Sequence, residues 1–177
     1  MGGGCLKNRG KQFEQLIKKA FEKFSDVSID RIPDQTMKYK GATNICDFIV
    51  YKYPYEYYIE CKSVQGNTLS IHSLPKADKK GNLYGFYGDI RDNQWNGLLE
   101  KSKVPGVIAG VIIWFIDKDI TIFIPMQELA KHRELGNKSV KYDYQSPNAI
   151  IISGTKKRTL FDYDMTSFFD SAQLKNF

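Results

Sequence analysis

The segment ICDFIVYKYPYEYYIECKSV, residues 45–64, decides the fold of this chain of 177 residues. Two runs rich in β-branched and aromatic residues flank Tyr53-Pro54, a pattern typical of two antiparallel strands joined by a turn. Residues that pair across such a hairpin have numbers with a constant sum, and a turn centred on Tyr53-Pro54 predicts that this sum is 107. In this register Asp47 lies directly opposite Glu60.

The predicted register brings two carboxylates together on one face of the sheet. Directly opposed positions have Cβ atoms about 5 Å apart, and like charges at that spacing destabilise a sheet. One of the two carboxylates would then tend to keep its proton. A divalent cation reverses this effect, because two carboxylate oxygens completed by water are what Mg²⁺ accepts. We therefore predict that Asp47 and Glu60 hold one Mg²⁺, for which Mn²⁺ is a substitute.

Lys62 belongs to the same predicted site, because side chains alternate along a strand and Lys62 shares the face of Glu60. The opposite face is expected to enter the core with Cys46, Phe48, Val50, Ile59 and Cys61. A metal that polarises a phosphoryl oxygen and lowers the pKa of a water molecule, beside a lysine that stabilises negative charge, suits phosphodiester hydrolysis. Because the pattern is short, a surface hairpin with exposed Asp, Glu and Lys side chains remains the alternative.

The rest of the chain alternates helical and strand patterns, which predicts one α/β domain over residues 1–177. Apolar residues at helical spacing predict a helix over 8–24, with Asn8 as its N-cap and Glu14 beside the apolar stripe. Further helices are expected at 91–103, 126–135 and 166–174, strands at 27–31, 106–116, 120–125 and 149–153, a loop at 30–44, and a long loop or insertion at 65–90.

The charge of the chain favours a polyanionic partner. Its formal net charge is +6, and the basic residues gather in residues 1–23, 76–80 and 156–158. The predicted contacts to DNA phosphates are Arg9, Lys11, Arg31, Lys38 and Lys40. Ordinary solvated charge is the alternative interpretation of these residues.

Several classes of protein are disfavoured by what the sequence lacks. Three cysteines without a CxxC pair indicate reduced thiols, and the absence of a signal peptide or of an apolar run long enough for a membrane favours a cytoplasmic protein. His72 and His132 have no metal-ligand spacing, which disfavours a zinc enzyme. The chain also has no GxSxG motif, P-loop or dinucleotide-binding fingerprint.

Asp47 followed by Glu60-Cys61-Lys62 resembles the D…ExK core of the PD-(D/E)xK nuclease superfamily. Within that superfamily the chain is similar to RecU-type Holliday junction resolvases. The similarity includes the opening NRGKQFE (8–14), the spacing of thirteen between Asp47 and Glu60, the stretch DNQWNGL (92–98) and the stretch GNKSVKYD (136–143). It therefore extends from the start of the chain to about residue 143.

This resemblance implies a restriction-endonuclease-like fold, in which helices flank a mixed central β-sheet. It implies that Asp47, Glu60 and Gln94 hold Mg²⁺, that Lys62 stabilises the transition state and that Glu14 lies near the site. It also implies a homodimer that resolves four-way junctions by paired symmetric nicks, a task for which two-fold symmetry is suited.

Three departures from the family pattern point to a compact member from a bacterium or a phage-infected cell. Ile45 stands where the family usually has a threonine, the segment 30–44 is too short for the family's long stalk, and 65–90 is longer than the usual link. A restriction- or repair-type nuclease acting on duplex DNA therefore stays open as an alternative. A non-catalytic DNA-binding module is a further alternative, although such a module has little use for opposed carboxylates.

Overall fold

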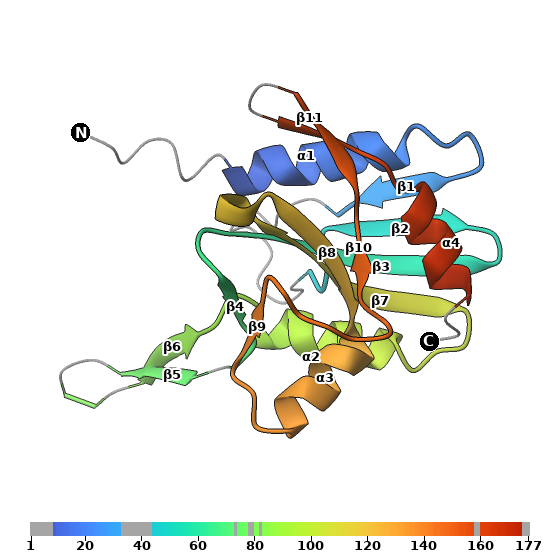
Figure 1. The fold of residues 1–177 in the computed structure, drawn as a ribbon. Helices are drawn as coiled ribbons and strands as arrows, with labels where there is room; N and C mark the ends of the chain where they lie inside the picture. Colours follow the sequence, from blue (N-terminus) through green and yellow to red (C-terminus); the bar gives the residue numbers. More distant parts are fainter. Residues whose placement is uncertain are drawn as a thin grey trace.

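The computed structural model describes residues 9–32, 44–72, 74–77, 80–81, 83–157 and 160–174. Its centre is a mixed six-stranded sheet with the strand order β1-β2-β3-β7-β8-β10 (Figure 1). The strands of this sheet are β1 (Ser28–Arg31), β2 (Phe48–Lys52), β3 (Tyr55–Val64), β7 (Val107–Phe115), β8 (Ile120–Pro125) and β10 (Ile150–Ile151). Strands β3 and β7 run parallel, and the other neighbouring strands run antiparallel.

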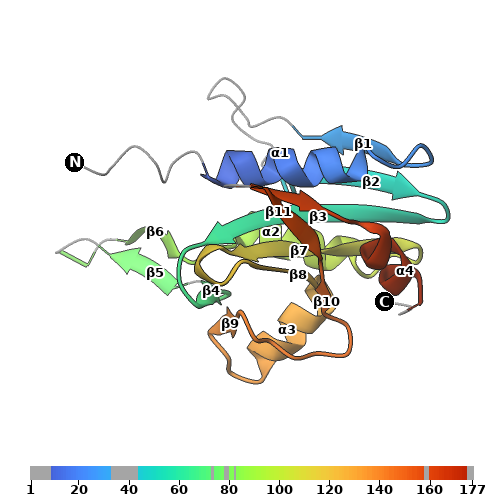
Figure 2. The same cartoon turned by 45° about the horizontal axis from the view of Figure 1, so that its top comes forward.

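Helices cover both faces of this sheet (Figure 2). The helices are α1 (Arg9–Phe21), α2 (Asp92–Lys101), α3 (Met126–Glu134) and α4 (Thr166–Leu174). Helices α1 and α4 contribute to the core on one face, and α2 and α3 contribute to the core on the other. The predicted fold class, a mixed sheet flanked by helices, is confirmed.

Strand β7 is buried along almost its whole length because both of its faces pack against a core. Ile108, Ile112 and Trp114 enter the core beneath α1 and α4. The alternate positions, from Ala109 to Phe115, enter the core beneath α2 and α3. An unbroken apolar run is typical of such a central strand, and it explains why the sequence pattern of 106–116 identifies this strand.

The hairpin of β2 and β3 has the predicted register. The pairs run from Phe48–Ile59 to Lys52–Tyr55, and each has a residue sum of 107. The ladder ends at Phe48, however, and the backbone N–H of Asp47 donates to the carbonyl oxygen of Ile59 at 3.0 Å. The predicted direct pairing of Asp47 with Glu60 is therefore wrong, because the chain leaves the regular ladder one residue before Asp47 is reached.

Because the chain leaves the regular β2–β3 ladder at Asp47, Cys46 does not lie on the face that was predicted for it. Phe48 and Cys61 lie in the core beneath α1, as predicted. Cys46 is buried in the opposite core, beneath α2. Strict alternation would have placed Cys46 and Phe48 on the same face, so the irregular backbone at Asp47 changes the face of the residue before it.

The segment 65–90, predicted to be a long loop or insertion, contains three short strands and is therefore not an irregular loop. Strand β4 (Thr68–Ser70) pairs with β9 (Ser139–Lys141), far along the chain. Strands β5 (Leu74–Ala77) and β6 (Leu83–Tyr87) form a two-stranded ribbon that projects from the body (Figure 1). Pro75 is tolerated in this ribbon because a strand with a free edge has no second partner that needs its missing N–H.

The other expected elements form with shifted ends. Residues 27–31 form β1, residues 149–153 supply the two-residue strand β10, and the three later helices appear as α2, α3 and α4. The sequence patterns missed β9 and the hairpin of β11 (Gly154–Lys157) with β12 (Leu160–Tyr163). Asn8 and most of the expected loop at 30–44 lie outside the described residues. None of the helices in the described part of the chain is long and apolar enough to cross a membrane.

Candidate active site

Asp47 and Glu60 meet beside the start of β2. Glu60 lies on β3 and is 2% exposed. The Oδ2 atom of Asp47 accepts a hydrogen bond of 2.7 Å from the backbone N–H of Cys61, the residue after Glu60. This bond ties the Asp47 side chain to β3. The two carboxylates are therefore held next to one another, although they are not partners in the strand ladder.

Lys62 and Gln94 form a closed network with Glu60. The Nζ atom of Lys62 is 2.8 Å from Oε1 of Glu60, and the Nε2 atom of Gln94 donates to the same oxygen at 2.6 Å. The Oε1 atom of Gln94 accepts from Lys62 Nζ at 3.3 Å and from the backbone N–H of Arg91 at 3.2 Å. The first turn of α2 therefore fixes the Gln94 amide, and this amide helps to fix Glu60 and Lys62.

One oxygen of Glu60 is left without a partner in this network. Its Oε2 atom is buried and has no hydrogen bond among the described residues. Leaving a buried polar atom unpaired costs about 1–3 kcal/mol, and more when the group is charged. The arrangement therefore favours a further group, outside the protein, that interacts with this oxygen.

The electrostatics of the site favour a positive charge. Burial, and then the charge of Glu60, raise the pKa of Asp47 to about 7. Burial also raises the pKa of Glu60, although Lys62 and Gln94 act against that rise. The charge of Glu60 thus opposes ionisation of Asp47, an effect that a divalent cation would relieve.

The donor atoms at this site fit Mg²⁺. Asp47 and Glu60 offer carboxylate oxygens, and Gln94 brings an amide oxygen into the same network. Mg²⁺ is bound through one or two carboxylates and keeps several waters. Within the described residues there is no group of three His, Cys, Asp or Glu side chains that could hold a metal, so the set does not suit a metal that needs a full cage of protein ligands.

Glu14 and Arg31 reach the site from α1 and β1. The Oε2 atom of Glu14 is 3.0 Å from Nη2 of Arg31, and the Glu14 side chain is 19% exposed. The charge of Glu14 contributes to the raised pKa of both Asp47 and Glu60. Glu14 therefore faces the carboxylate pair, while Arg31, a predicted phosphate contact, is paired with an acid at the edge of the site.

The structure describes two of the other four predicted phosphate contacts. Arg9 and Lys11 lie in the first turn of α1, where Arg9 is half-buried and Lys11 is exposed. Lys38 and Lys40 lie outside the described residues. The role of these four residues in DNA binding remains a prediction.

Ile45, two residues before Asp47, packs against α2. A Cβ atom added at Gly97 would lie 2.3 Å from Cγ2 and 2.8 Å from Cβ of Ile45. The glycine therefore lets α2, which carries Gln94, come close to the segment that leads into Asp47. No sequence pattern indicated this contact, because Gly97 only weakened the helical pattern.

Gly97→Ala is expected to destabilise the protein by about 1 kcal/mol. Overpacking costs about 1–3 kcal/mol, and the gain in helix propensity is about 1 kcal/mol. Ile45 cannot give way cheaply, because β-branched side chains are stiff. Urea denaturation measures the difference in the free energy of unfolding between Gly97→Ala and the unaltered protein. Gly10→Ala in α1 is the matched control, since its new Cβ meets Ser63 Oγ at 3.7 Å. Equal stabilisation by both substitutions would contradict the close approach of α2.

The comparisons with known proteins give limited information. No family model matches the chain, and no curated protein matches it. A solved structure, that of the Holliday junction resolvase Hjc of the archaeal hyperthermophile Archaeoglobus fulgidus, has 15% sequence identity and a TM-score of 0.40, and the match covers 67% of this chain and 78% of that chain. A likeness at this level leaves the function to be inferred from the site itself.

Proposed function

We propose that this chain is a Mg²⁺-dependent endodeoxyribonuclease. The observation that carries the proposal is the unpaired, buried Oε2 atom of Glu60, next to Asp47 and in the same network as Lys62. Two opposed acids and an ammonium in a buried network are costly for stability alone. They are useful together if the acids hold a cation and the ammonium meets an anionic substrate.

The residues of the site have separate roles in this proposal. Asp47 and Glu60 hold Mg²⁺, which supplies polarisation of the phosphoryl group and activation of water. Lys62, 19% exposed, can turn its ammonium toward the negative charge that develops on the phosphate. Gln94 orients both Glu60 and Lys62, and it becomes a metal ligand if its amide oxygen turns away from Lys62. Glu14 adds negative charge beside the metal.

The substrate is proposed to be a four-way DNA junction. The net charge of +6 suits a polyanion. The resemblance to RecU-type resolvases rests on Asp47, Glu60 and Lys62 together with the α1 and α2 motifs. A homodimer would place two equal sites on a two-fold symmetric junction, so that paired nicks follow from symmetry.

The test compares a four-way junction with a linear duplex that has the same arm sequence, each with Mg²⁺ or with a chelator. We expect symmetric nicks on the junction with Mg²⁺, very little cutting of the duplex, and no cutting with the chelator. Equal cutting of both substrates would reject the four-way junction as the preferred substrate and would indicate a nuclease that acts on duplex DNA. Mg²⁺-independent DNA binding with no cutting of either substrate would reject the nuclease.

A further inference from the structure

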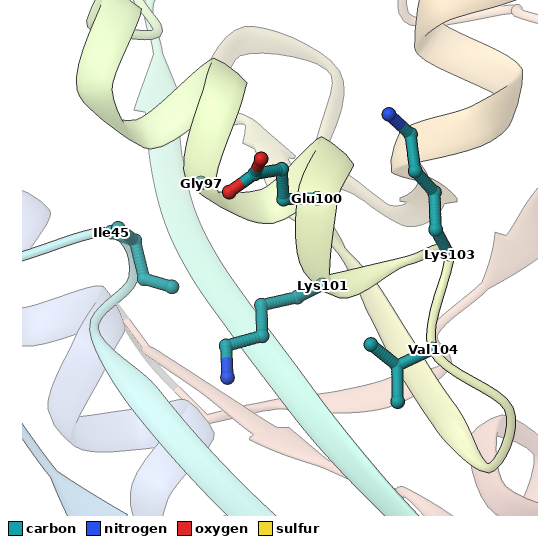
Figure 3. Close-up of a pocket in the computed structure, with 6 residues that line it drawn as sticks. All are labelled: Ile45, Gly97, Glu100, Lys101, Lys103 and Val104. Atoms are coloured by element: carbon teal, nitrogen blue, oxygen red, sulfur yellow. The ribbon is translucent and has the colours of Figure 1, made fainter.

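A pocket of about 460 Å³ lies beside the candidate active site. It is formed by the C-terminal half of α2, the loop that follows α2 and the segment before Asp47 (Figure 3). The residues that line it are Ile45, Gly97, Glu100, Lys101, Lys103 and Val104. None of these residues has a role in the proposed chemistry.

Helix α2 and strand β3 each extend from the candidate active site to the pocket. Helix α2 carries Gln94 near its start and Lys101 at its end, a rise of about 10 Å over seven residues. Strand β3 carries Tyr58 two residues before Glu60, about 7 Å away on the same face. The Nζ atom of Lys101 lies 4.7 Å from the centre of the Tyr58 ring. The pocket therefore begins on the order of 10 Å from the carboxylates.

The chemistry of the pocket suits an anion with an apolar part. Lys101 is half-buried and Lys103 is exposed, and neither ammonium is in an ion pair with a carboxylate of the described residues. Glu100 is the acid among the lining residues, which leaves a net charge of +1. Ile45 and Val104 supply apolar surface on opposite sides of Lys101 (Figure 3).

We propose that this pocket holds a backbone phosphate of the DNA strand that the carboxylates engage. This inference rests on the proposed function, because it takes DNA as the ligand. Successive phosphates of one strand lie about 7 Å apart, because the backbone winds around the helix axis as it rises by about 3.4 Å per nucleotide, so the pocket phosphate lies about one or two nucleotides from the one at Asp47 and Glu60. Lys101 contacts the phosphate as a point charge, and the exposed Lys103 side chain, which extends away from Lys101 in Figure 3, turns toward the phosphate when DNA binds. Ile45 and Val104 contact the sugar. The pocket thus sets the direction in which the strand leaves the site.

The first test measures junction binding by fluorescence anisotropy in chelator, over a range of salt concentrations. We expect Lys101→Gln/Lys103→Gln to bind about 10-fold more weakly. The slope of log K against log salt should fall by about 0.9, the value for one phosphate contact. Lys103→Gln alone changes an exposed side chain and gives a smaller loss in a protein whose fold is not at risk. Glu100→Gln should bind more tightly, and weaker binding by this variant would overturn the proposal.

Lys118→Gln is the matched control. Lys118 also lies over a tyrosine ring, 5.1 Å from the centre of Tyr142, but it follows the far end of β7. Its replacement removes one positive charge, as Lys103→Gln does, and we expect no change in the slope of log K against log salt. An equal change in the slope for Lys118→Gln would show a general charge effect and overturn the pocket.

The deciding test replaces single phosphates of the junction by uncharged methylphosphonates. In the unaltered protein, replacement at one position about one or two nucleotides from the nick should lower the affinity. In Lys101→Gln/Lys103→Gln the same replacement should not lower the affinity further, because the contact to this phosphate has already been removed. Losses of affinity that are additive at every position would overturn the proposed phosphate pocket. The nuclease proposal would still be supported if the unaltered protein nicks the junction. Failure of the unaltered protein to bind DNA would overturn both.

Discussion

Glu60→Gln lowers the rate of DNA nicking by about 10³-fold or more and leaves DNA binding within about two-fold. Glutamine has the shape of the buried Glu60 side chain, but it lacks the charge that would hold a cation. Contact with the DNA backbone comes from basic residues elsewhere, so the affinity is kept. Single-turnover nicking of a labelled four-way junction measures the rate, and anisotropy in chelator measures the binding.

Glu56→Gln is the control for this prediction. Glu56 lies on the same strand and the same face as Glu60, four residues earlier, and it is half-buried. The substitution removes the same charge at a distance from the site, so nicking should continue at the original rate. If Glu60→Gln kept more than about one tenth of the rate, the carboxylate would not be part of the chemistry.

Asp47→Asn stabilises the metal-free protein at pH 8, by up to about 4 kcal/mol. The pKa of Asp47 is raised in the folded protein, from 3.8 to about 7, chiefly by burial. Between these two values the native state binds a proton that the unfolded state has released. The contribution of Asp47 to stability is therefore greatest below pH 4, falls as the pH rises to about 7, and stays low above it. Asparagine carries no charge, so this loss disappears.

Urea denaturation in chelator at pH 5 and pH 8 measures the effect, which should be larger at pH 8. Asp162→Asn is a control of opposite sign, because Lys157 and Lys23 lower the pKa of Asp162 to about 2. Its contribution to stability is present above the unfolded pKa, so its removal destabilises the protein at pH 8. Adding Mg²⁺ should stabilise the unaltered protein at pH 8 and have no effect on Asp47→Asn. A loss of stability in Asp47→Asn without metal would contradict the proposed electrostatics.

The sequence predicts those parts of the fold that local patterns specify. The register of β2 with β3 follows from the turn at Tyr53-Pro54 and from side-chain alternation. Strand β7 follows from its apolar run, and α1 and α3 follow from helical spacing. The proximity of Asp47, Glu60 and Lys62 could also be predicted, because all three lie in one hairpin.

The remaining features depend on contacts between distant parts of the chain. The pairing of β4 with β9 joins segments about seventy residues apart, so the glycines and proline of 65–90 alone suggested a loop. The bond from Cys61 N–H to Asp47 Oδ2 replaces the expected ladder pair, and no local pattern indicates such an irregularity. The ion pair of Arg31 with Glu14 likewise joins a strand to a helix. Resemblance to a family, rather than residue spacing, suggested that Gln94 belongs to the site.

Asp47 and Glu60 are proposed to share one divalent cation. Electron paramagnetic resonance of Mn²⁺ titrated into the protein at pH 8 tests this claim without DNA and without catalysis. We expect one bound Mn²⁺ per chain, displaced by Mg²⁺, lost in both Glu60→Gln and Asp47→Asn, and kept in Glu56→Gln. Absence of bound Mn²⁺ in the unaltered protein, or undiminished binding in Glu60→Gln, would contradict it.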